Sequence, residues 1–196
     1  MMFLMARWQP ETSQRLIVAA VDLFNEQGYD ATTVAQIAER AGVTKSTFFR
    51  HFADKRELLV AGQKTLSRLL AEGIAQAPAD ASPLEAVAAG LERASSAMGP
   101  ANRELGPRLK AAVAASTELQ ERDALKSVGM AAAMSAALLA RDVPDPIARL
   151  AAEMGVLAFK QGYAQWSESD RDDPNGLAHH ALTALAELRA ATASLG

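Results

Sequence analysis

Signals that start and stop helices recur along the whole chain and divide it into nine segments. Thr33 with Gln36, and Ser82 with Glu85, have the spacing of capping boxes, and glycine or proline follows several segments. No segment has a convincing strand pattern, and 43 alanines with only 5% aromatic residues favour closely packed helices. The sequence therefore predicts an all-α protein with helices at about 12–28, 33–41, 44–51, 54–77, 82–99, 101–115, 117–140, 145–166 and 175–193.

The fourth predicted helix sets the domain organisation. Its roughly 23 residues would span about 35 Å, which is too long for a three-helix unit alone. We therefore expect it to bridge two domains, a first one at residues 1–54 and a helical second one at residues 55–196.

The absence of cysteine and the positions of the histidines exclude several classes of protein. The chain has no cysteine, which excludes disulfides, thiolate metal sites and cysteine nucleophiles. Its three histidines, His51, His179 and His180, stand in no pattern typical of catalysis or metal binding. We therefore expect no enzyme activity, no metal and no cofactor.

The chain also lacks a predicted membrane segment. Its longest uncharged run lies between Lys126 and Arg141 and is shorter than the roughly 18 to 20 residues needed to cross a bilayer. The start, MMFLMARWQP, does not have the order of a secretory signal. These features predict a soluble, cytoplasmic protein with no membrane partner.

Charge is distributed unevenly, although the total is only −3. Between residues 40 and 56 one carboxylate, Asp54, stands against a group of basic residues, with His51 beside them: Arg40, Lys45, Arg50, Lys55 and Arg56. A concentrated basic patch can bind phosphates while the rest of the chain stays acidic.

This basic stretch overlaps a helix-turn-helix pattern. Residues 33–51 contain two short predicted helices joined at Gly42, and the helix at 12–28 can complete a three-helix core. Such an arrangement places its second helix in the major groove of DNA. Short helix pairs also occur in ordinary helical bundles, so the pattern alone leaves that alternative open.

The string LFNEQGYDATTVAQIAERAGVTKSTFFRHFADKRELL adds a resemblance. It resembles the amino-terminal DNA-binding domain of TetR/AcrR-type transcriptional repressors over about residues 12–60. The matching positions are Gly28, Tyr29, Thr32, Thr33, Ile37, Ala38, Ala41, Gly42, Val43, His51, Phe52 and Lys55. Farther along, STELQERDALK is similar to regulators with a mycofactocin-type carboxy-terminal domain, and the resemblance as a whole implies a nine-helix TetR-like architecture.

Spacing within the third predicted helix separates core from surface. Phe48 and Phe52 lie four residues apart and can pack inward together. Lysine can donate to guanine acceptors, and hydroxyls can contact bases or phosphate. The exposed or bordering positions are then Lys45, Ser46, Thr47 and Arg50, which in the alternative reading are merely solvated.

Other candidate contacts flank this helix. Thr33 and Thr44 are predicted helix caps, and a helix start presents free amides to phosphate. The resemblance implies phosphate contacts at His51 and Lys55, while Phe49 stands where most relatives have tyrosine and can offer only ring contact. The candidate DNA-binding residues are Thr33, Thr44, Lys45, Ser46, Thr47, Phe49, Arg50, His51 and Lys55.

The last two predicted helices are apolar on more than one side, whereas one bundle core needs a single stripe. The resemblance implies that they form a four-helix interface in a homodimer, and wholly internal packing is the alternative. The candidate interface residues are Val156, Trp166, Leu182 and Leu185.

The resemblance also implies a small-molecule pocket in the second domain. Methionine and aromatic side chains can line an adaptable apolar cavity, although at helical spacing they are commonly plain core. The candidate pocket residues are Met98, Arg108, Met130, Met134, Met154, Phe159 and Tyr163.

Together these features predict a dimeric transcriptional repressor that binds a pseudo-palindromic double-stranded DNA operator and is released by a small-molecule effector. The alternative is an architectural or partner-recruiting DNA-binding protein on the same fold with no effector.

Overall fold

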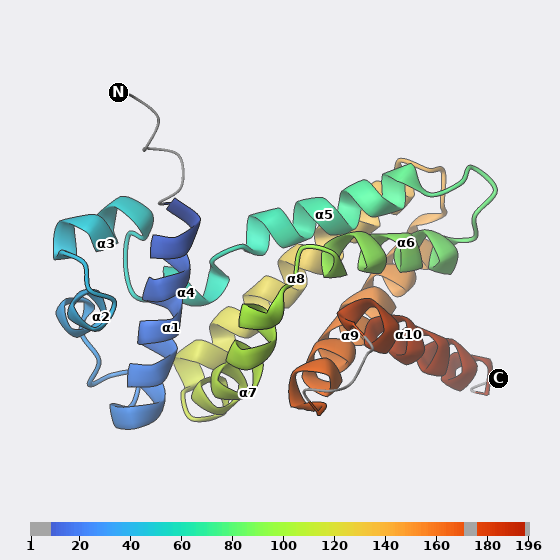
Figure 1. Ribbon diagram of the computed structural model, residues 1–196. Helices are drawn as coiled ribbons and strands as arrows, with labels where there is room; N and C mark the ends of the chain where they lie inside the picture. The colour runs from blue at the N-terminus through green and yellow to red at the C-terminus, as the bar shows by residue number, and fades with distance from the viewer. Residues whose placement is uncertain (1–8, 171–175, 195–196) are drawn as a thin grey trace, which may run out of the picture. The chain divides into compact units, whose positions relative to one another are not determined.

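The computed structural model describes residues 9–170 and 176–194, and every regular element in these ranges is helical (Figure 1). This confirms the predicted all-α class. The helices are α1 (Gln9–Gln27), α2 (Val34–Arg40), α3 (Lys45–His51), α4 (Glu57–Val60), α5 (Gln63–Gln76), α6 (Pro83–Ser95), α7 (Pro100–Ala114), α8 (Thr117–Leu139), α9 (Asp145–Glu168) and α10 (Leu177–Ala193).

The prediction of one helix over 54–77 was wrong, because the chain breaks after Val60. Ala61 is extended (φ −55°, ψ 132°), and Gly62 adopts a left-handed conformation with φ 77°. Glycine reaches this region without steric cost because it has no Cβ. The segment therefore contains two helices, α4 and α5.

Contacts divide the described residues into two compact units. Unit 1 comprises residues 9–61 and 108–124, and unit 2 comprises residues 62–107, 125–170 and 176–194. The chain passes between the units three times, after Ala61, within α7 and within α8. The predicted boundary after residue 54 stays a prediction.

Unit 1 is built on the packing of α1, α2 and α3 around fully buried Leu16, Ile37 and Phe48. The ring centroids of Phe48 and Phe52 lie 5.8 Å apart. Ala112 of α7 and Leu119 of α8 are buried in the same core. The three amino-terminal helices therefore share their core with a segment that follows much later in the chain.

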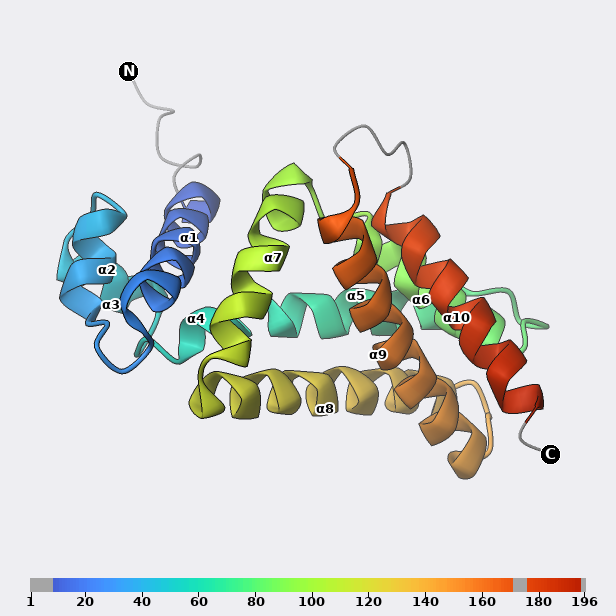
Figure 2. The same ribbon diagram turned by 90° about the horizontal axis from the view of Figure 1, so that it is seen from below.

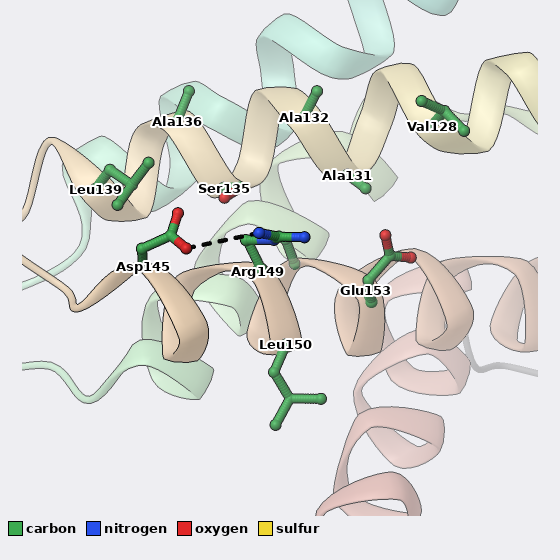
Figure 3. Close-up of a pocket in the computed structure, with 11 residues that line it drawn as sticks. Val128, Ala131, Ala132, Ser135, Ala136, Leu139, Asp145, Arg149, Leu150 and Glu153 are labelled. Carbon is green, nitrogen blue, oxygen red and sulfur yellow. Dashed lines mark ion pairs between the residues drawn. The ribbon is translucent and has the colours of Figure 1, made fainter.

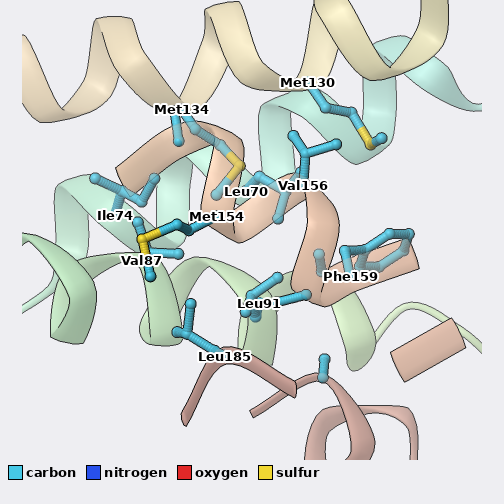
Figure 4. Packing of buried hydrophobic residues seen from close by; sticks show 14 of the residues in the cluster. Leu70, Ile74, Val87, Leu91, Met130, Met134, Met154, Val156, Phe159 and Leu185 are labelled. Atoms are coloured by element: carbon cyan, nitrogen blue, oxygen red, sulfur yellow. The ribbon is translucent and has the colours of Figure 1, made fainter. Parts of the chain in front are cut away.

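Unit 2 depends on close approaches between paired helices, α5 with α6 and α9 with α10 (Figure 2). A Cβ added to Gly73 would lie 2.5 Å from the Ala89 carbonyl oxygen, and one added to Gly162 would lie 2.5 Å from Ala181 Cα. The absence of a side chain at Gly73 and Gly162 therefore allows the backbones of the paired helices to approach closely. Around them lies an apolar core that includes Leu70, Ile74, Val87, Leu91, Met134 and Met154 (Figure 4).

No helix within the described ranges combines the length and apolar character required to span a membrane.

Candidate nucleic-acid interface

The turn between α2 and α3 is fixed by local hydrogen bonds. The Thr33 hydroxyl accepts from the Gln36 amide at 3.3 Å, and the Gln36 side chain accepts from the Thr33 amide at 2.9 Å, which confirms the predicted capping box. After α2, the Gly42 amide donates to the Glu39 carbonyl and the Val43 amide donates to the Ala38 carbonyl, each at 2.9 Å. This is a Schellman ending, and Gly42 supplies its left-handed residue with φ 67°.

The start of α3 is fixed by a second threonine. Thr44 caps the helix, since its hydroxyl accepts from the Thr47 amide at 3.1 Å. The hydroxyl oxygens of Thr44 and Thr47 also lie 3.0 Å apart. Both side chains therefore hold the helix start in addition to being candidate DNA contacts.

Burial divides α3 into two sides. Phe48 is fully buried and Phe52 is 6% exposed, while Phe49 is 55% exposed and meets the Phe48 ring edge-on at 5.4 Å. Exposed side chains near Phe49 on the helix form a surface that we call the α3 face, consisting of Lys45, Ser46, Phe49 and Arg50. It combines two cations, a hydroxyl and an aromatic ring.

The cations of the α3 face differ from the neighbouring arginines in their ion pairing. Arg40 pairs with Glu26 at 2.7 Å and Arg56 pairs with Asp54 at 2.7 Å. These guanidiniums lower the pKa of Glu26 and of Asp54 through hydrogen bonds to the carboxylates. Among the described residues, Lys45 and Arg50 form no such ion pair, so their charge is available to a phosphate or a base.

His51 and Lys55 follow this face along the chain and are partly buried. His51 is half-buried at the end of α3, with its ring centroid 6.3 Å from that of Phe52. Lys55 Nζ donates to the carbonyl oxygens of Tyr29 at 2.7 Å and Thr32 at 3.0 Å, and it lies 4.0 Å from the centre of the Tyr29 ring. The structure therefore uses Lys55 to hold the loop between α1 and α2.

Tyr29 of the same loop also forms a hydrogen bond with α8. The Tyr29 hydroxyl donates to Glu118 Oε1 of α8 at 3.1 Å. Burial and this hydrogen bond raise the pKa of Tyr29 above its ordinary value. Sequence reasoning missed this linkage, because no local motif joins Tyr29 to Lys55 or to Glu118.

We expect Lys55→Met to lower the free energy of unfolding by about 1.5 to 3 kcal/mol, the usual range for hydrogen bonds to a charged group. Methionine keeps much of the apolar stem but leaves the two carbonyls without their donor. Urea denaturation followed by circular dichroism measures the change. The matched control is Lys45→Met on the α3 face, which should stay within about 0.5 kcal/mol; equal losses would contradict a structural role for Lys55.

The residues predicted to line a pocket lie mostly in the core of unit 2. Met130, Met134, Met154 and Phe159 are buried there, and Met98 packs against them while half-buried. Figure 4 shows the first four packed among side chains of the neighbouring helices.

The last two pocket candidates, Tyr163 and Arg108, belong to different units. The Tyr163 hydroxyl donates to the Asn102 carbonyl at 2.6 Å within unit 2, and burial raises the pKa of Tyr163 to about 12. Arg108 belongs to unit 1, where it pairs with Asp22 at 2.7 Å. Arg108 and the other six pocket candidates therefore belong to different units.

The residues predicted to form a dimer interface are largely buried within one chain. Val156 is 5% exposed, Trp166 is 6% exposed and Leu185 is 6% exposed, all in the core of unit 2. Only Leu182 is half-buried. Helix α9 packs against α6 and α10 of the same chain, and Val156 and Trp166 lie in the core that these helices share. Three of the four side chains therefore have almost no surface left for a second copy.

Comparison with known proteins finds matches to the amino-terminal region. Residues 16–61 match the family described as bacterial regulatory proteins, tetR family. Over 76 residues, 39% of the chain, the sequence is 41% identical to the HTH-type transcriptional regulator TcmR of Streptomyces glaucescens. Over 68 residues, 35% of the chain, it is 41% identical to the HTH-type transcriptional regulator BetI of Yersinia pestis. The match covers 34% of the length of each relative.

Solved structures extend the similarity of fold to most of the chain. The transcriptional regulator FadR from Bacillus subtilis, solved in complex with stearoyl-CoA, matches 89% of this chain and 96% of its own, with a TM-score of 0.56 and 19% identity. Salmonella enterica GusR matches 94% of this chain and 96% of its own, with a TM-score of 0.56 and 17% identity. At these identities the comparison shows a shared fold. The helix-turn-helix region of this chain is therefore similar to the family described as bacterial regulatory proteins, tetR family, over residues 16–61.

Proposed function

We propose that this protein is a cytoplasmic transcriptional repressor that binds a pseudo-palindromic operator as a homodimer and leaves it when a small molecule binds unit 2. The observation that carries the proposal is the α3 face. Lys45 and Arg50 are exposed without a carboxylate partner among the described residues, on a helix whose other side is locked into the core by Phe48.

The chemistry of the α3 face suits the major groove. Lysine and arginine match the O6 and N7 acceptors of guanine, and the hydroxyl of Ser46 can reach a base or a phosphate. Phe49 has no hydroxyl to donate, but an exposed phenylalanine ring can contact the methyl group of thymine. These side chains can therefore distinguish DNA bases as well as bind the sugar-phosphate backbone.

The length of α3 argues for a dimer. Its seven residues rise about 10 Å, which covers about three base pairs at 3.4 Å each. Three base pairs recur far too often in a genome to direct a regulator. A homodimer doubles the contacted sequence and requires half-sites about one helical turn apart.

Release by a small molecule is supported by the composition of the unit 2 core. Met130, Met134 and Met154 are buried there, and methionine side chains adapt readily to a new neighbour. An effector must bind the state that is unable to hold DNA more tightly, since only differential affinity shifts the equilibrium.

Footprinting of the full chain on genomic fragments tests the proposal. Two protected half-sites related by a two-fold axis are expected, and protection by a monomer would contradict the dimer. Lauroyl-CoA and stearoyl-CoA, the ligands held by two of the similar structures, are the first probes for release. If neither these nor a wider metabolite set releases the DNA, the protein is a DNA-binding protein without an effector.

Lys45→Ala should relax the preference at one base pair of each half-site and cost about 1 to 3 kcal/mol of binding to the preferred sequence. Electrophoretic mobility shifts on operators substituted at each position measure the change. Lys64→Ala, an exposed lysine of α5, is the matched control and should leave the preference unaltered. A uniform loss across all sequences would make Lys45 a phosphate contact.

A further inference from the structure

Exposed arginines line two of the grooves on the described surface, and their partners differ. One groove, of about 580 Å³, lies between α8 and α9, and its Arg149 pairs with Asp145 of the same helix at 3.7 Å (Figure 3). Both side chains are more than half exposed, so this ion pair contributes little. The other groove, of about 290 Å³, lies in unit 1 between α1 and the end of α2, and its Arg15 binds a different part of the fold.

Arg15 of α1 donates hydrogen bonds to the turn between α2 and α3. Its terminal nitrogen Nη2 donates to the carbonyl oxygen of Ala41 and, at 3.4 Å, to that of Gly42. Among the described residues, no backbone amide donates to either oxygen. A helix end leaves such carbonyls without partners, and a cation suits the negative end of the helix dipole. A Cβ added to Gly42 would lie 2.9 Å from the same nitrogen, so the glycine leaves the space that the guanidinium occupies.

The helix that carries Arg15 is itself held in unit 1. Leu16, the next residue, is fully buried in the core of this unit. Farther along α1, Asp22 pairs with Arg108 of α7 at 2.7 Å, and Asn25 Nδ2 donates to the Arg108 carbonyl oxygen at 2.9 Å. Arg15 therefore connects the turn to a helix that is fixed at several other points.

The turn is the support for the amino-terminal end of α3. Phe48 and Phe52 are buried at the middle and the carboxy-terminal end of the helix. Its amino-terminal residues contact base edges in helix-turn-helix proteins, and Gly42 lies three residues before Lys45, where α3 begins. On a helix about 10 Å long, a tilt of about 10° around one end moves the other end by about 2 Å. Hydrogen bonds tolerate a change of only about half an ångström in length, so such a tilt would break contacts with bases.

We propose that Arg15 is a positioning residue for DNA recognition, because its guanidinium holds the α2–α3 turn on α1 and thereby sets the tilt of α3 in the major groove. The proposal rests on the DNA binding of the proposed function and adds a residue outside the helix-turn-helix. Arg15 then acts through Lys45 and the rest of the α3 face. Since its side chain is exposed, the alternative is a direct phosphate contact, which the salt dependence of binding distinguishes.

Arg15→Met separates the two roles, because it removes the guanidinium and keeps much of the apolar stem. The probes are a duplex that the wild-type chain selects from random-sequence DNA, and poly(dI-dC) as non-specific DNA. Loss of positioning should lower affinity for the selected duplex at least about tenfold and change affinity for poly(dI-dC) by less than about twofold. The salt slope on the selected duplex should stay the same. Equal weakening on both DNAs with a slope lower by about one unit would reveal a phosphate contact and overturn the proposal.

Hydrogen exchange of the full chain without DNA checks the cause. The amides of Gly42 and Val43, which donate to carbonyls of α2, should exchange several-fold faster in the Arg15→Met variant. Circular dichroism should show unchanged helix content, because the side chain is exposed. Exchange at the wild-type rate in these two amides would overturn the role of Arg15 in holding the turn.

Gln14→Met is the matched control, because Gln14 lines the same groove and its buried side-chain nitrogen has no hydrogen-bond partner among the described residues. This variant should alter neither the DNA preference nor the exchange of the turn. A loss equal to that of Arg15→Met would assign the effect to packing in the groove and overturn the proposal. A wild-type chain that selects no DNA sequence would contradict the proposed function itself, whereas an Arg15→Met chain that keeps the wild-type preference would overturn only the role of Arg15.

Discussion

Phe48→Ala should lower the free energy of unfolding by about 3 to 5 kcal/mol, the usual cost of removing a fully buried phenylalanine ring. Phe48 is completely shielded from solvent and packs against the ring of Phe52. The cavity would open where α3 meets α1 and α2, so amide hydrogen exchange should accelerate most in these helices. Urea denaturation of the full chain gives the total loss.

The adjacent Phe49→Ala is the matched control for this variant, because the same side chain is removed one residue later on the same helix. With 55% of its surface exposed, Phe49 contributes far less packing, and its loss should stay below about 1 kcal/mol. Its effect should fall on DNA affinity instead. Equal losses of stability at the two positions would contradict the orientation of α3.

Gly162→Ala should destabilise unit 2 by about 1 to 3 kcal/mol through overpacking. The new Cβ would lie 2.5 Å from the backbone of Ala181, so α9 and α10 must move apart. Helix propensity alone predicts the opposite sign, because alanine is favoured over glycine inside a helix by about 1 kcal/mol. A lower free energy of unfolding would therefore show that the packing of the two backbones dominates, and a higher one would show that helix propensity dominates.

Gly99→Ala serves as the control for Gly162→Ala. A Cβ at Gly99 would meet no heavy atom within 4 Å, and its backbone is not in the left-handed region. This variant should stay within about 0.5 kcal/mol of the wild-type chain. The midpoint of urea denaturation, followed by circular dichroism, compares the two. A stabilised Gly162→Ala chain would contradict the close approach of α9 and α10.

Features that depend on nearby residues were predictable from the sequence. The capping boxes at Thr33 and Ser82 lie where the spacing of threonine or serine to glutamine or glutamate indicates them. The burial of Phe48 and Phe52 follows from their separation by four residues. These signals are local because a helix cap or a helix face is formed within one or two turns of chain.

Features that depend on distant partners were not predictable in the same way. Apolar spacing continues across Gly62, so only the backbone angles reveal the break before α5. The apolar residues on more than one side of α9 indicate burial, but they do not indicate whether the covering helix belongs to the same chain or to a second one. The carbonyl partners of Lys55 are 23 and 26 residues away along the chain, and no pattern in the sequence marks such a separation.

The membership of residues 108–124 in unit 1 has a consequence for the synthesis of the protein. Ribosomes deliver the chain from its amino terminus, and domains usually fold as units while synthesis proceeds. Here α1, α2 and α3 emerge long before Ala112 and Leu119, which are buried in the same core, and before Glu118, which accepts from Tyr29. Helices α1, α2 and α3 therefore cannot complete their core until α7 and the start of α8 have also been translated.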